Sequence, residues 1–438
     1  MDLVTTESCY SKDNDREEDE VLLQPYLQFT QISHVRAKYI SSMFHCFNYW
    51  LKVPQEQLKQ IINIFETQYN SFIMLDDIYD GLVARSGVPV MHSIYGLPHT
   101  LNSVNYATSN ALEKLLDLGD PRIMSLYIEH GQKMHAGNGM EIYWRDNIIC
   151  PTEKEYLEIA VPKTSSAFCF GIKVMQLFSD NSENLDKLVT TLGQLFQIWN
   201  DLVTLKSEKP AMADTSSDQI FYSNHADKKR DQILLQSIIH TAKMPDKNIW
   251  SSLMQALNYW FKIPNEKFEA ISNIIKLWRV TNYVLIDVEE NALLRDGAAT
   301  ANSLYGNSHA INSAYYGLFI ILEKIHDLGK YDAVNLATEN FLDFHKGKGM
   351  EFNWRDFLKC PTEEEYVKMA IRNILRRKVR NPEHFKYCRK LLEQVGSIEY
   401  TKQTLRNLRS EAEEEMKKFE ENPCMIQLLD DIFSKLKM

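Results

Sequence analysis

The pattern of apolar positions along the chain predicts an all-α fold. After Ala160, apolar residues recur at helical spacing through residues 161–180 and again through residues 188–208. The apolar run that leads into the sequence LDDIYDG contains no helix breaker, and we expect it to be helical as well. Glycine and proline, which favour tight turns, contribute only 16 and 13 of the 438 residues, so long helices are favoured throughout.

An internal duplication sets the organisation of the chain. The segment 139–156 (GMEIYWRDNIICPTEKEY) matches the segment 349–366 (GMEFNWRDFLKCPTEEEY) at 12 of 18 positions. The same offset of 210 residues relates NYWLKVP to NYWFKIP and SIYG to SLYG. A single offset kept over such a distance predicts a duplicated domain, because a short solenoid unit would recur many times.

The two copies are not equally complete. Their correspondence ends near Ala160 and Ala370, and the two helical patterns that follow Ala160 have no equivalent in the second copy. We therefore predict the following organisation, in chain order: an acidic flexible tail (1–20), a first domain (21–208), a polar aperiodic linker (209–229) and an incomplete second copy (230–438) that ends in a charged helical segment (371–438).

Charge and composition exclude several classes of protein. The net charge of −10 argues against binding to a phosphate backbone, so we expect no nucleic-acid partner. The N-terminal residues do not resemble a signal peptide and no stretch is apolar enough to span a membrane, so a cytoplasmic location is expected. The seven scattered cysteines contain no CxxC pair and indicate neither a disulfide framework nor a zinc site.

The acidic sequence DDIYD provides the first candidate site. On a helix, Asp76 and Asp80 lie four residues apart on one face, beside Asp77, so their carboxylates can point toward a common position. Hard divalent cations such as Mg²⁺ prefer these oxygen ligands. Taken alone, three acidic residues in such an acidic chain are weak evidence for a metal site.

A second set of oxygen ligands lies at the end of the helical pattern 188–208. Asn200, Thr204 and Glu208 follow one another at four-residue intervals beside Asp201, which gives a polar stripe along one helix face. Two facing clusters of hard ligands predict a cavity in which metal ions bridge a polyanionic substrate. Nearby anion contacts are predicted for four residues, namely Arg85, Lys163, Thr164 and Gln197.

Several motifs, in order along the chain, resemble those of animal geranylgeranyl diphosphate synthases. These are DDIYDG, GVPVMHSIYG, GNGMEIYWRDN, CPTEKEY, PKT, MQLFSD and FQIWND. The resemblance covers residues 21–208, resumes over residues 230–370 and includes the C-terminal tail. It implies the all-α isoprenoid synthase fold, here duplicated, with helices around a deep apolar cavity and Asp-rich motifs at its mouth. It also implies Mg²⁺ as cofactor, in a cluster of three ions.

The resemblance assigns roles to the candidate residues and exposes departures from the family. Asp76, Asp77 and Asp80 match the first metal motif, and the four predicted anion contacts match residues that hold the allylic diphosphate. A synthase that elongates its substrate also binds isopentenyl diphosphate through characteristic cationic side chains. The corresponding positions here are Ile32, Ser33, Arg36, Tyr69 and Ser86, of which only Arg36 matches. Affinity for a second diphosphate should therefore be low.

The second metal motif also differs from that of the elongating synthases. Asn200, Thr204 and Glu208 are similar to the metal-binding triad of class I terpene synthases, a group to which insect enzymes of this family have diverged. The sequence therefore predicts a Mg²⁺-dependent terpene synthase that ionises geranyl or farnesyl diphosphate, with Tyr69, Phe72 and Trp199 facing the resulting cation. The alternatives are a prenyl diphosphate synthase with a rearranged acceptor site and a non-catalytic partner of such a synthase.

The second copy is predicted to be catalytically empty. Its counterpart of the Asp motif reads IDVEE over residues 286–290, and the stretch that would carry an equivalent of Lys163 is missing. Because the resembled family generally dimerises, we expect either a homodimer or an intrachain pseudo-dimer of the two copies. Two further alternatives stay open, namely that residues 371–438 complete the first copy and that the gene is a fusion.

Overall fold

The computed structural model describes residues 13–32, 34–85, 87–206, 226–244 and 249–356, together with scattered positions between 399 and 430. The chain forms two compact units. The first comprises residues 1–244 and 277–372, and the second comprises residues 245–276 and 373–438. These units do not coincide with the two sequence copies, because the first unit takes helices from both.

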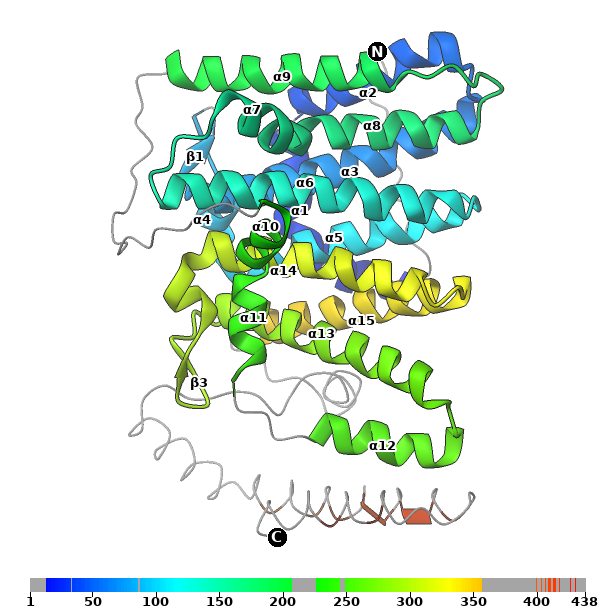
Figure 1. Ribbon diagram of the computed structural model, residues 1–438, viewed down its shortest axis with the longest axis vertical. Helices are drawn as coiled ribbons and strands as arrows, with labels where there is room; N and C mark the ends of the chain where they lie inside the picture. Colours follow the sequence, from blue (N-terminus) through cyan, green and yellow to red (C-terminus); the bar gives the residue numbers. More distant parts are fainter. Residues whose placement is uncertain are drawn as a thin grey trace. The chain divides into compact units, whose positions relative to one another are not determined.

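The first copy is a set of long helices, as the apolar pattern predicts (Figure 1). In chain order its elements are α1 (Asp13–Ile32), α2 (His34–Leu51), α3 (Gln55–Tyr79), the hairpin strands β1 (Ala84–Arg85) and β2 (Val88–Pro89), α4 (Met91–Tyr95), α5 (Leu97–Asp117), α6 (Arg122–Asp146), α7 (Glu153–Glu155), the π-helix η1 (Tyr156–Ala160), α8 (Val161–Leu177) and α9 (Asp186–Lys206). The all-α fold class is confirmed.

The second copy repeats this order without equivalents of α8 and α9 among its described residues. Its elements are α10 (Ala226–Leu234), α11 (Gln236–Ala242), α12 (Ile249–Phe261), α13 (Asn265–Glu289), the strands β3 (Leu294–Arg295) and β4 (Ala298–Ala299), α14 (Ala301–His326) and α15 (Tyr331–Asp356). The repetition extends to the backbone, because Gly96 and Gly306 share a φ of 79° at the same kink. That left-handed conformation favours glycine.

Some boundaries differ from those expected from the sequence. Helix α1 begins at Asp13, inside the segment predicted as an acidic tail, and α10 begins at Ala226, inside the predicted linker. The rest of that linker, residues 209–225, and nearly all of the C-terminal segment 371–438 lie outside the described residues.

Within the first unit, helices of the two copies share one hydrophobic core. Helix α6 packs on α14, and α5 packs on α15 (Figure 1). One continuous cluster of buried residues joins Leu75 and Val104 of the first copy to Val284 and Ala314 of the second. Burial of this apolar surface is the main force that holds the two copies together.

The contacts between the copies are related by a pseudo-twofold axis. Under the 210-residue offset, α6 corresponds to α15 and α5 corresponds to α14, so the pairs α6–α14 and α5–α15 are equivalent contacts. A Cβ atom on Gly139 of α6 would lie 2.3 Å from the Asn312 amide nitrogen of α14. One on Gly349 of α15 would lie 2.4 Å from that of Asn102 on α5. The packing of one pair thus repeats that of the other.

A single hydrogen bond marks the position of the axis. The Tyr315 hydroxyl donates to the side-chain oxygen of Asn105, and these residues occupy corresponding positions in the two copies. A residue can contact its own equivalent only next to a twofold axis. The described contacts between the two copies in the first unit are therefore arranged about a pseudo-twofold axis.

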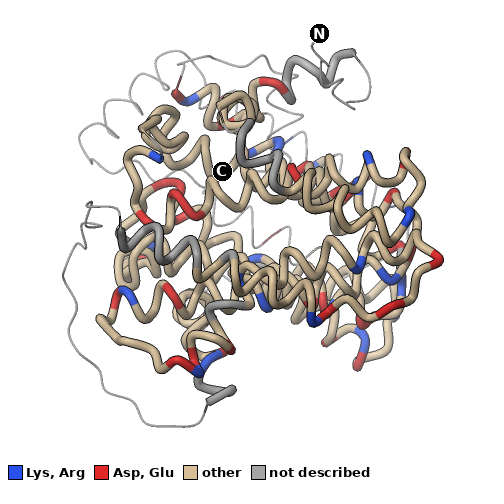
Figure 2. Tube along the Cα trace, turned by 90° about the horizontal axis from the view of Figure 1, so that it is seen from above, with Lys and Arg blue, Asp and Glu red and all other residues tan. Residues whose placement is uncertain are grey.

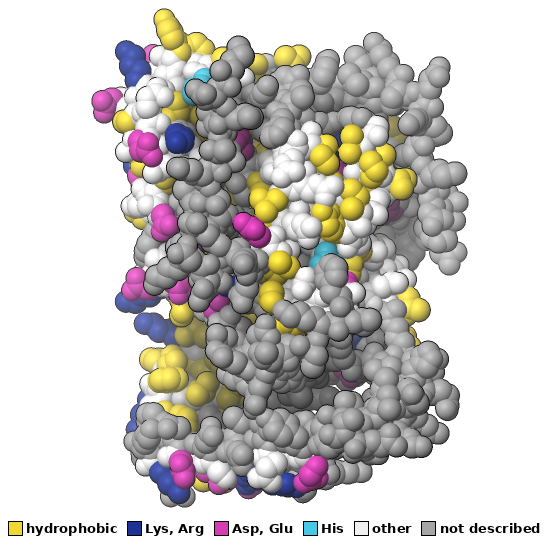
Figure 3. Space-filling model, turned by 180° about the vertical axis from the view of Figure 1, so that it is seen from behind, with side chains coloured by type: hydrophobic (Ala, Val, Ile, Leu, Met, Phe, Trp, Pro, Cys, Tyr) yellow, Lys and Arg dark blue, Asp and Glu magenta, His cyan; other side chains and the backbone are white. Residues whose placement is uncertain are grey.

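Basic and acidic residues are mixed along the described part of the chain. Lys and Arg are interspersed with Asp and Glu (Figure 2). Apolar side chains also reach the surface (Figure 3), and on α9 four of them lie at helical intervals, namely Leu188, Leu192, Leu195 and Ile198. None of the helices in the described part of the chain is long and apolar enough to cross a membrane.

Candidate active site

The end of α3 brings together the first charged residues of the site. The Asp80 amide donates to the Asp76 carbonyl at 2.9 Å, and Gly81 then reverses the chain with a φ of 59°. The Leu82 amide returns to the Asp77 carbonyl at 3.0 Å. The β1–β2 hairpin that follows carries Arg85 back over the end of α3.

The three aspartates of this motif have different environments. The Asp77 side chain is only 3% exposed and accepts a hydrogen bond from Arg85 Nε. Asp76 and Asp80 are more accessible, with side-chain exposures of 19% and 47%. Arg85 Nη2 also lies 3.5 Å from Asp76 Oδ2. Asp77 is therefore engaged in a buried ion pair, whereas Asp76 and Asp80 have surface available to a ligand.

Lys163 connects this motif to α6. Its Nζ lies 2.9 Å from Asp76 Oδ1 and 3.0 Å from Glu141 Oε2. The π-helix η1 just before it packs closely against α6, because a Cβ on Gly137 would lie only 2.6 Å from the Ile159 carbonyl oxygen. Insertion of a π-turn rotates the following helix, and the absence of a side chain at Gly137 lets the backbones approach.

Burial and opposite charges control the ionisation of these groups. Burial raises the pKa of Asp76, but the Lys163 and Arg85 charges outweigh it and hold the pKa below its usual value. Burial, together with the Asp76 charge, raises the pKa of Asp80. Burial lowers the pKa of Lys163, but the neighbouring carboxylates Asp76 and Glu141 raise it well above normal. Asp76 and Lys163 are therefore both charged at neutral pH.

Two further charged residues of the site were not predicted from the sequence. Glu141 binds Lys163, and Arg145 lies one turn later on α6. Arg145 Nη1 donates to the Tyr79 carbonyl at 2.8 Å and lies 3.3 Å from Asp80 Oδ1. Both residues fall within the strongest repeated segment, 139–156, and their four-residue spacing was the available signal.

Helix α9 lies against α8 beside these residues. The Thr164 hydroxyl donates to the Gln197 side-chain oxygen, so the structure brings these two predicted residues together. A Cβ on Gly193 would lie 2.5 Å from the Ser165 Cα, which shows how closely the helices cross. The backbone of α9 also contains residues Trp199, Asn200, Asp201 and Thr204. Their side chains, and all of Glu208, lie outside the described part of the structure.

Aromatic rings form a layer beneath the charged residues. Phe72 lies one turn before Asp76 on α3, with its ring 5.9 Å from Lys163 Nζ. The ring of His135 lies edge-to-face with it at 6.3 Å. Two turns after Lys163 on α8, Phe170 packs against Phe65 of α3 at 4.9 Å. Helices α3 and α8 thus each present a charged residue and, farther along the same face, an aromatic ring.

Histidine within the aromatic layer is neutral. Burial lowers the pKa of His135 to about 4, and the nearby Asn312 side chain opposes this shift without cancelling it. Burial likewise lowers the pKa of His130 to about 4. The layer therefore carries no positive charge of its own at neutral pH.

The described residues are compatible with a divalent cation at Asp76 and Asp80. These two carboxylates lie one turn apart on α3 and retain exposure, whereas Asp77 is committed to Arg85. No three Asp, Glu, His or Cys side chains converge on one point among the described residues. The remaining candidate ligands are the α9 residues whose side chains are not described.

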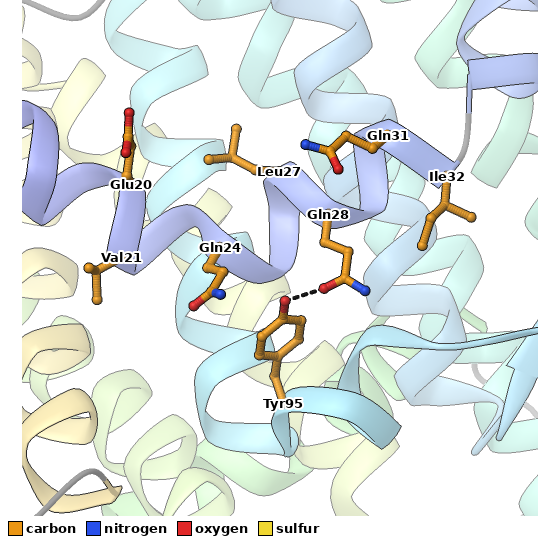
Figure 4. A pocket seen from close by; sticks show the side chains of 8 residues that line it. All are labelled: Glu20, Val21, Gln24, Leu27, Gln28, Gln31, Ile32 and Tyr95. Atoms are coloured by element: carbon orange, nitrogen blue, oxygen red, sulfur yellow. Dashed lines mark hydrogen bonds between the residues drawn. The ribbon is translucent and has the colours of Figure 1, made fainter.

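The predicted departures from an acceptor site fall on α1, α2, α3 and the first hairpin. Tyr69 lies in α3 and is partly buried, and Ile32 is exposed at the end of α1. A surface groove of about 790 Å³ runs beside α1 and includes Ile32 and Tyr95 (Figure 4). No Lys or Arg is among its eight lining residues. The side chain of Arg36, and all of Ser33 and Ser86, lie outside the described residues.

The second copy fills the equivalent position with ion pairs. Arg295 holds Asp287 through two nitrogens, with Nη2 2.6 Å from Asp287 Oδ1. Lys348, only 3% exposed, places Nζ 3.4 Å from Glu290 and 3.5 Å from Glu351. Burial raises the pKa of Glu289 to about 8. Ile286 replaces Asp76, so the second copy lacks the accessible carboxylate that binds Lys163 in the first.

Comparison with known proteins identifies the relationship. The chain matches the family described as polyprenyl synthetase over residues 26–220 and 231–373. It is 40% identical over 201 residues to a terpene synthase from Matsumurasca onukii, which covers 45% of this chain and 65% of the relative. It is 42% identical over 175 residues to a geranylgeranyl pyrophosphate synthase from Penicillium canescens, covering 40% of this chain and 51% of the relative. The aligned segments thus span half to two thirds of these relatives.

Proposed function

The chain belongs to the polyprenyl synthetase family, and we propose that it is a Mg²⁺-dependent class I terpene synthase that acts on a short prenyl diphosphate. One observation carries the proposal. A layer of charged side chains, formed by Asp76, Asp80, Lys163 and Arg145, lies directly above a layer of aromatic rings that begins at Phe72. This arrangement suits a ligand with a polyanionic head and a hydrocarbon tail.

The charged layer would bind the diphosphate and favour its departure. Asp76 and Asp80, with Asn200, Thr204 and Glu208, are the proposed ligands of Mg²⁺, which supplies positive charge against the diphosphate oxygens when it is bound. Lys163 and Arg85 form ion pairs with Asp76 in the structure. When the diphosphate binds, both side chains would also contact its oxygens. The carbon–oxygen bond breaks, and its electron pair leaves with the diphosphate.

The aromatic layer would receive the allylic cation that remains. Phe72 is the first ring below Asp76 and Lys163, and Tyr69 lies one turn farther along α3. Each ring can stabilise a nearby cation by about 0.5 to 2 kcal/mol when water is excluded. Proton loss or capture of water then ends the reaction. We propose geranyl or farnesyl diphosphate as the substrate, because the Phe72 ring limits the space beneath Asp76.

A second candidate function is elongation of a prenyl diphosphate by isopentenyl diphosphate. It is favoured by the names of several relatives, including the Penicillium canescens enzyme and a geranylgeranyl pyrophosphate synthase from Macrophomina phaseolina that is 41% identical over 183 residues. Against it stand the serines at positions 33 and 86 and Tyr69, which replace three cationic side chains of the resembled synthases. Each lost charge-assisted contact costs about 1.5 to 3 kcal/mol.

Product analysis separates the functions. Purified full-length chain would be incubated with geranyl or farnesyl diphosphate and Mg²⁺, with and without labelled isopentenyl diphosphate. We expect a free hydrocarbon or alcohol and no incorporation of label. A longer labelled diphosphate would support the elongating synthase instead, and absence of any turnover would support a non-catalytic partner.

A further inference from the structure

We propose that the second copy forms the base of the hydrocarbon pocket of the first, with Phe319 and Tyr315 of α14 limiting the length of the bound prenyl chain. This inference rests on the proposed function, because it takes a prenyl diphosphate as the ligand. The second copy would then take a direct part in substrate selection, although the carboxylates of its own acidic motif are engaged in ion pairs.

Phe319 of α14 packs directly on a helix of the first copy. Its ring is 6% exposed and lies on the backbone of α6, where a Cβ on Gly131 would be only 2.0 Å from Phe319 Cε1. On either side of Gly131, one turn away, the ring contacts Tyr127 and His135 at centroid distances of 5.1 and 5.3 Å. A ring of the second copy is therefore seated in a depression of the helix that carries Glu141 and Arg145.

Helix α14 also packs against the His135 ring of the first copy. Tyr315, one turn before Phe319, stacks on the imidazole with a centroid distance of 5.3 Å and an interplanar angle of 6°. Asn312 donates to the His135 carbonyl oxygen at 3.1 Å. The Tyr315 hydroxyl is held in turn by Asn105. Asn312, Tyr315 and Phe319 of α14 thus all contact His135 of the first copy.

A chain of contacts joins these rings to the charged layer. The Lys163 ammonium binds Asp76 and lies over Phe72, and Phe72 contacts His135. The imidazole of His135 therefore contacts both Phe72 and the two rings of α14. A hydrocarbon chain that extends from the charged layer past Phe72 would reach His135 and then Phe319 or Tyr315. Phe72 is the upper limit of the pocket, and the α14 rings are the lower limit.

Changes of opposite size at position 319 test this inference. The full-length chain would carry Phe319→Ala or Phe319→Trp, each in the wild-type and in a Phe72→Ala background, since Phe72 restricts access to the lower ring. Phe341→Ala is the matched control, because Phe341 lies on α15 of the same copy and stacks on Trp278 instead. Circular dichroism and thermal unfolding would verify folding, and Phe319→Leu replaces Phe319→Ala if the alanine variant does not fold.

The measured quantity is the ratio of kcat/KM for geranylgeranyl diphosphate to that for farnesyl diphosphate. In the Phe72→Ala background, we expect Phe319→Ala to raise this ratio at least about tenfold, Phe319→Trp to lower it, and Phe341→Ala to leave it unchanged. Equal ratios for the three residues at position 319 would overturn the inference. A ratio that Phe341→Ala changes as much as Phe319→Ala would also overturn it.

A binding measurement distinguishes failure of this inference from failure of the proposed function. Unreactive thiolodiphosphate analogues of the same chain lengths would be titrated into each variant by calorimetry. Wild-type protein that binds no analogue, and turns over no prenyl diphosphate, would refute the proposed function and this inference with it. Wild-type protein that binds the analogues, but whose order of affinities is the same in every variant at position 319, would refute this inference alone.

Discussion

At the scale of single residues, one substitution distinguishes the two acidic motifs. Both copies keep a buried Asp–Arg pair, Asp77 with Arg85 and Asp287 with Arg295. Only the first copy has an accessible carboxylate one position earlier, because Ile286 replaces Asp76 in the second. The shared pair stabilises the end of a helix and its hairpin, whereas the residue that differs provides the contact to Lys163.

This distinction predicts different effects of substitution in the two copies. Asp76→Ala should lower kcat by at least about a hundredfold, because it removes a proposed metal ligand while the protein stays folded. Asp287→Ala should leave kcat near wild type but destabilise the protein by about 1 to 3 kcal/mol, because it removes the buried carboxylate that binds the part-buried Arg295. Steady-state kinetics and chemical denaturation would measure both effects. Near-normal turnover by Asp76→Ala would remove the metal assignment.

The buried carboxyl group of Glu289 predicts an unusual dependence of stability on pH. Its pKa is raised to about 8 in the folded chain by burial, against 4.5 for an ordinary glutamate. Between these values the folded state binds more protons than the unfolded state, so the free energy of unfolding should fall as pH rises from about 4.5 to about 8. Above that range the contribution of this residue should level off.

Glu289→Gln tests this assignment, because glutamine resembles the protonated acid. The variant should be as stable as wild type near about pH 5 and more stable near about pH 8, with a flatter dependence between them. Thermal unfolding followed by circular dichroism across this range provides the measurement. Glu183→Gln, which alters an exposed carboxyl of the first copy, serves as the control. An identical pH profile for Glu289→Gln and wild type would contradict the raised pKa.

At the scale of elements, the sequence predicted the helices better than their contacts. Regular apolar spacing predicted α8 and α9, and the 210-residue offset predicted that α14 and α15 would repeat α5 and α6. Helical spacing also predicted that Phe72 would lie one turn from Asp76 on the cavity side; in the structure its ring lies 5.9 Å from Lys163 Nζ, and its place in a cavity stays a prediction. Spacing along one helix fixes which residues share a face, and it is therefore informative within an element.

The contributions of neighbouring helices could not be read from the sequence. Glu141 reaches Lys163 because a π-turn and Gly137 bring α6 and α8 together, and neither feature follows from apolar periodicity. From the sequence, Gly131 shows only that α6 has no side chain at this position. The sequence does not show that Phe319 of the second copy packs there, because this contact depends on the pseudo-twofold packing of the helices.

The close crossing of α8 and α9 predicts the effect of a change at Gly193. Alanine is the better helix former by about 0.8 to 1 kcal/mol, so an isolated α9 would gain stability from Gly193→Ala. In the protein, however, the new Cβ would meet the Ser165 backbone at 2.5 Å and displace α9 from α8. Because α9 carries Gln197 and Asn200, we expect KM for the prenyl diphosphate to rise at least about fivefold.

The control for this experiment is Thr191→Ala, which alters an exposed residue of the same helix. Its KM should equal that of wild type. Isothermal titration with an unreactive analogue would show whether Gly193→Ala weakens binding itself. Unchanged affinity in a folded Gly193→Ala variant would mean that the position of α9 does not control diphosphate binding.

At the scale of the whole molecule, duplication has turned a symmetric contact into an internal one. In a homodimer, both subunits are identical and each must keep every residue that catalysis and packing require. Within one chain the two halves can diverge. The first copy retains Asp76 and Lys163, and the second has lost the counterpart of Asp76 while it keeps Tyr315 and Phe319 against α6. Packing has therefore been retained where the acidic motif has not.

This arrangement predicts that the chain is a monomer in solution. The helices through which the copies contact one another, α5, α6, α14 and α15, already cover each other within the first unit, so a second chain is not needed to bury them. Light scattering coupled to size-exclusion chromatography should give the mass of one chain, 51.1 kDa, across a range of micromolar concentrations. A stable species of twice that mass would show that another surface dimerises.

Asn312→Arg tests whether the contact between α14 and α6 lies within one chain or between two chains. It introduces a charge between these helices, so it should unfold the protein if the contact is internal and only dissociate a dimer if it is not.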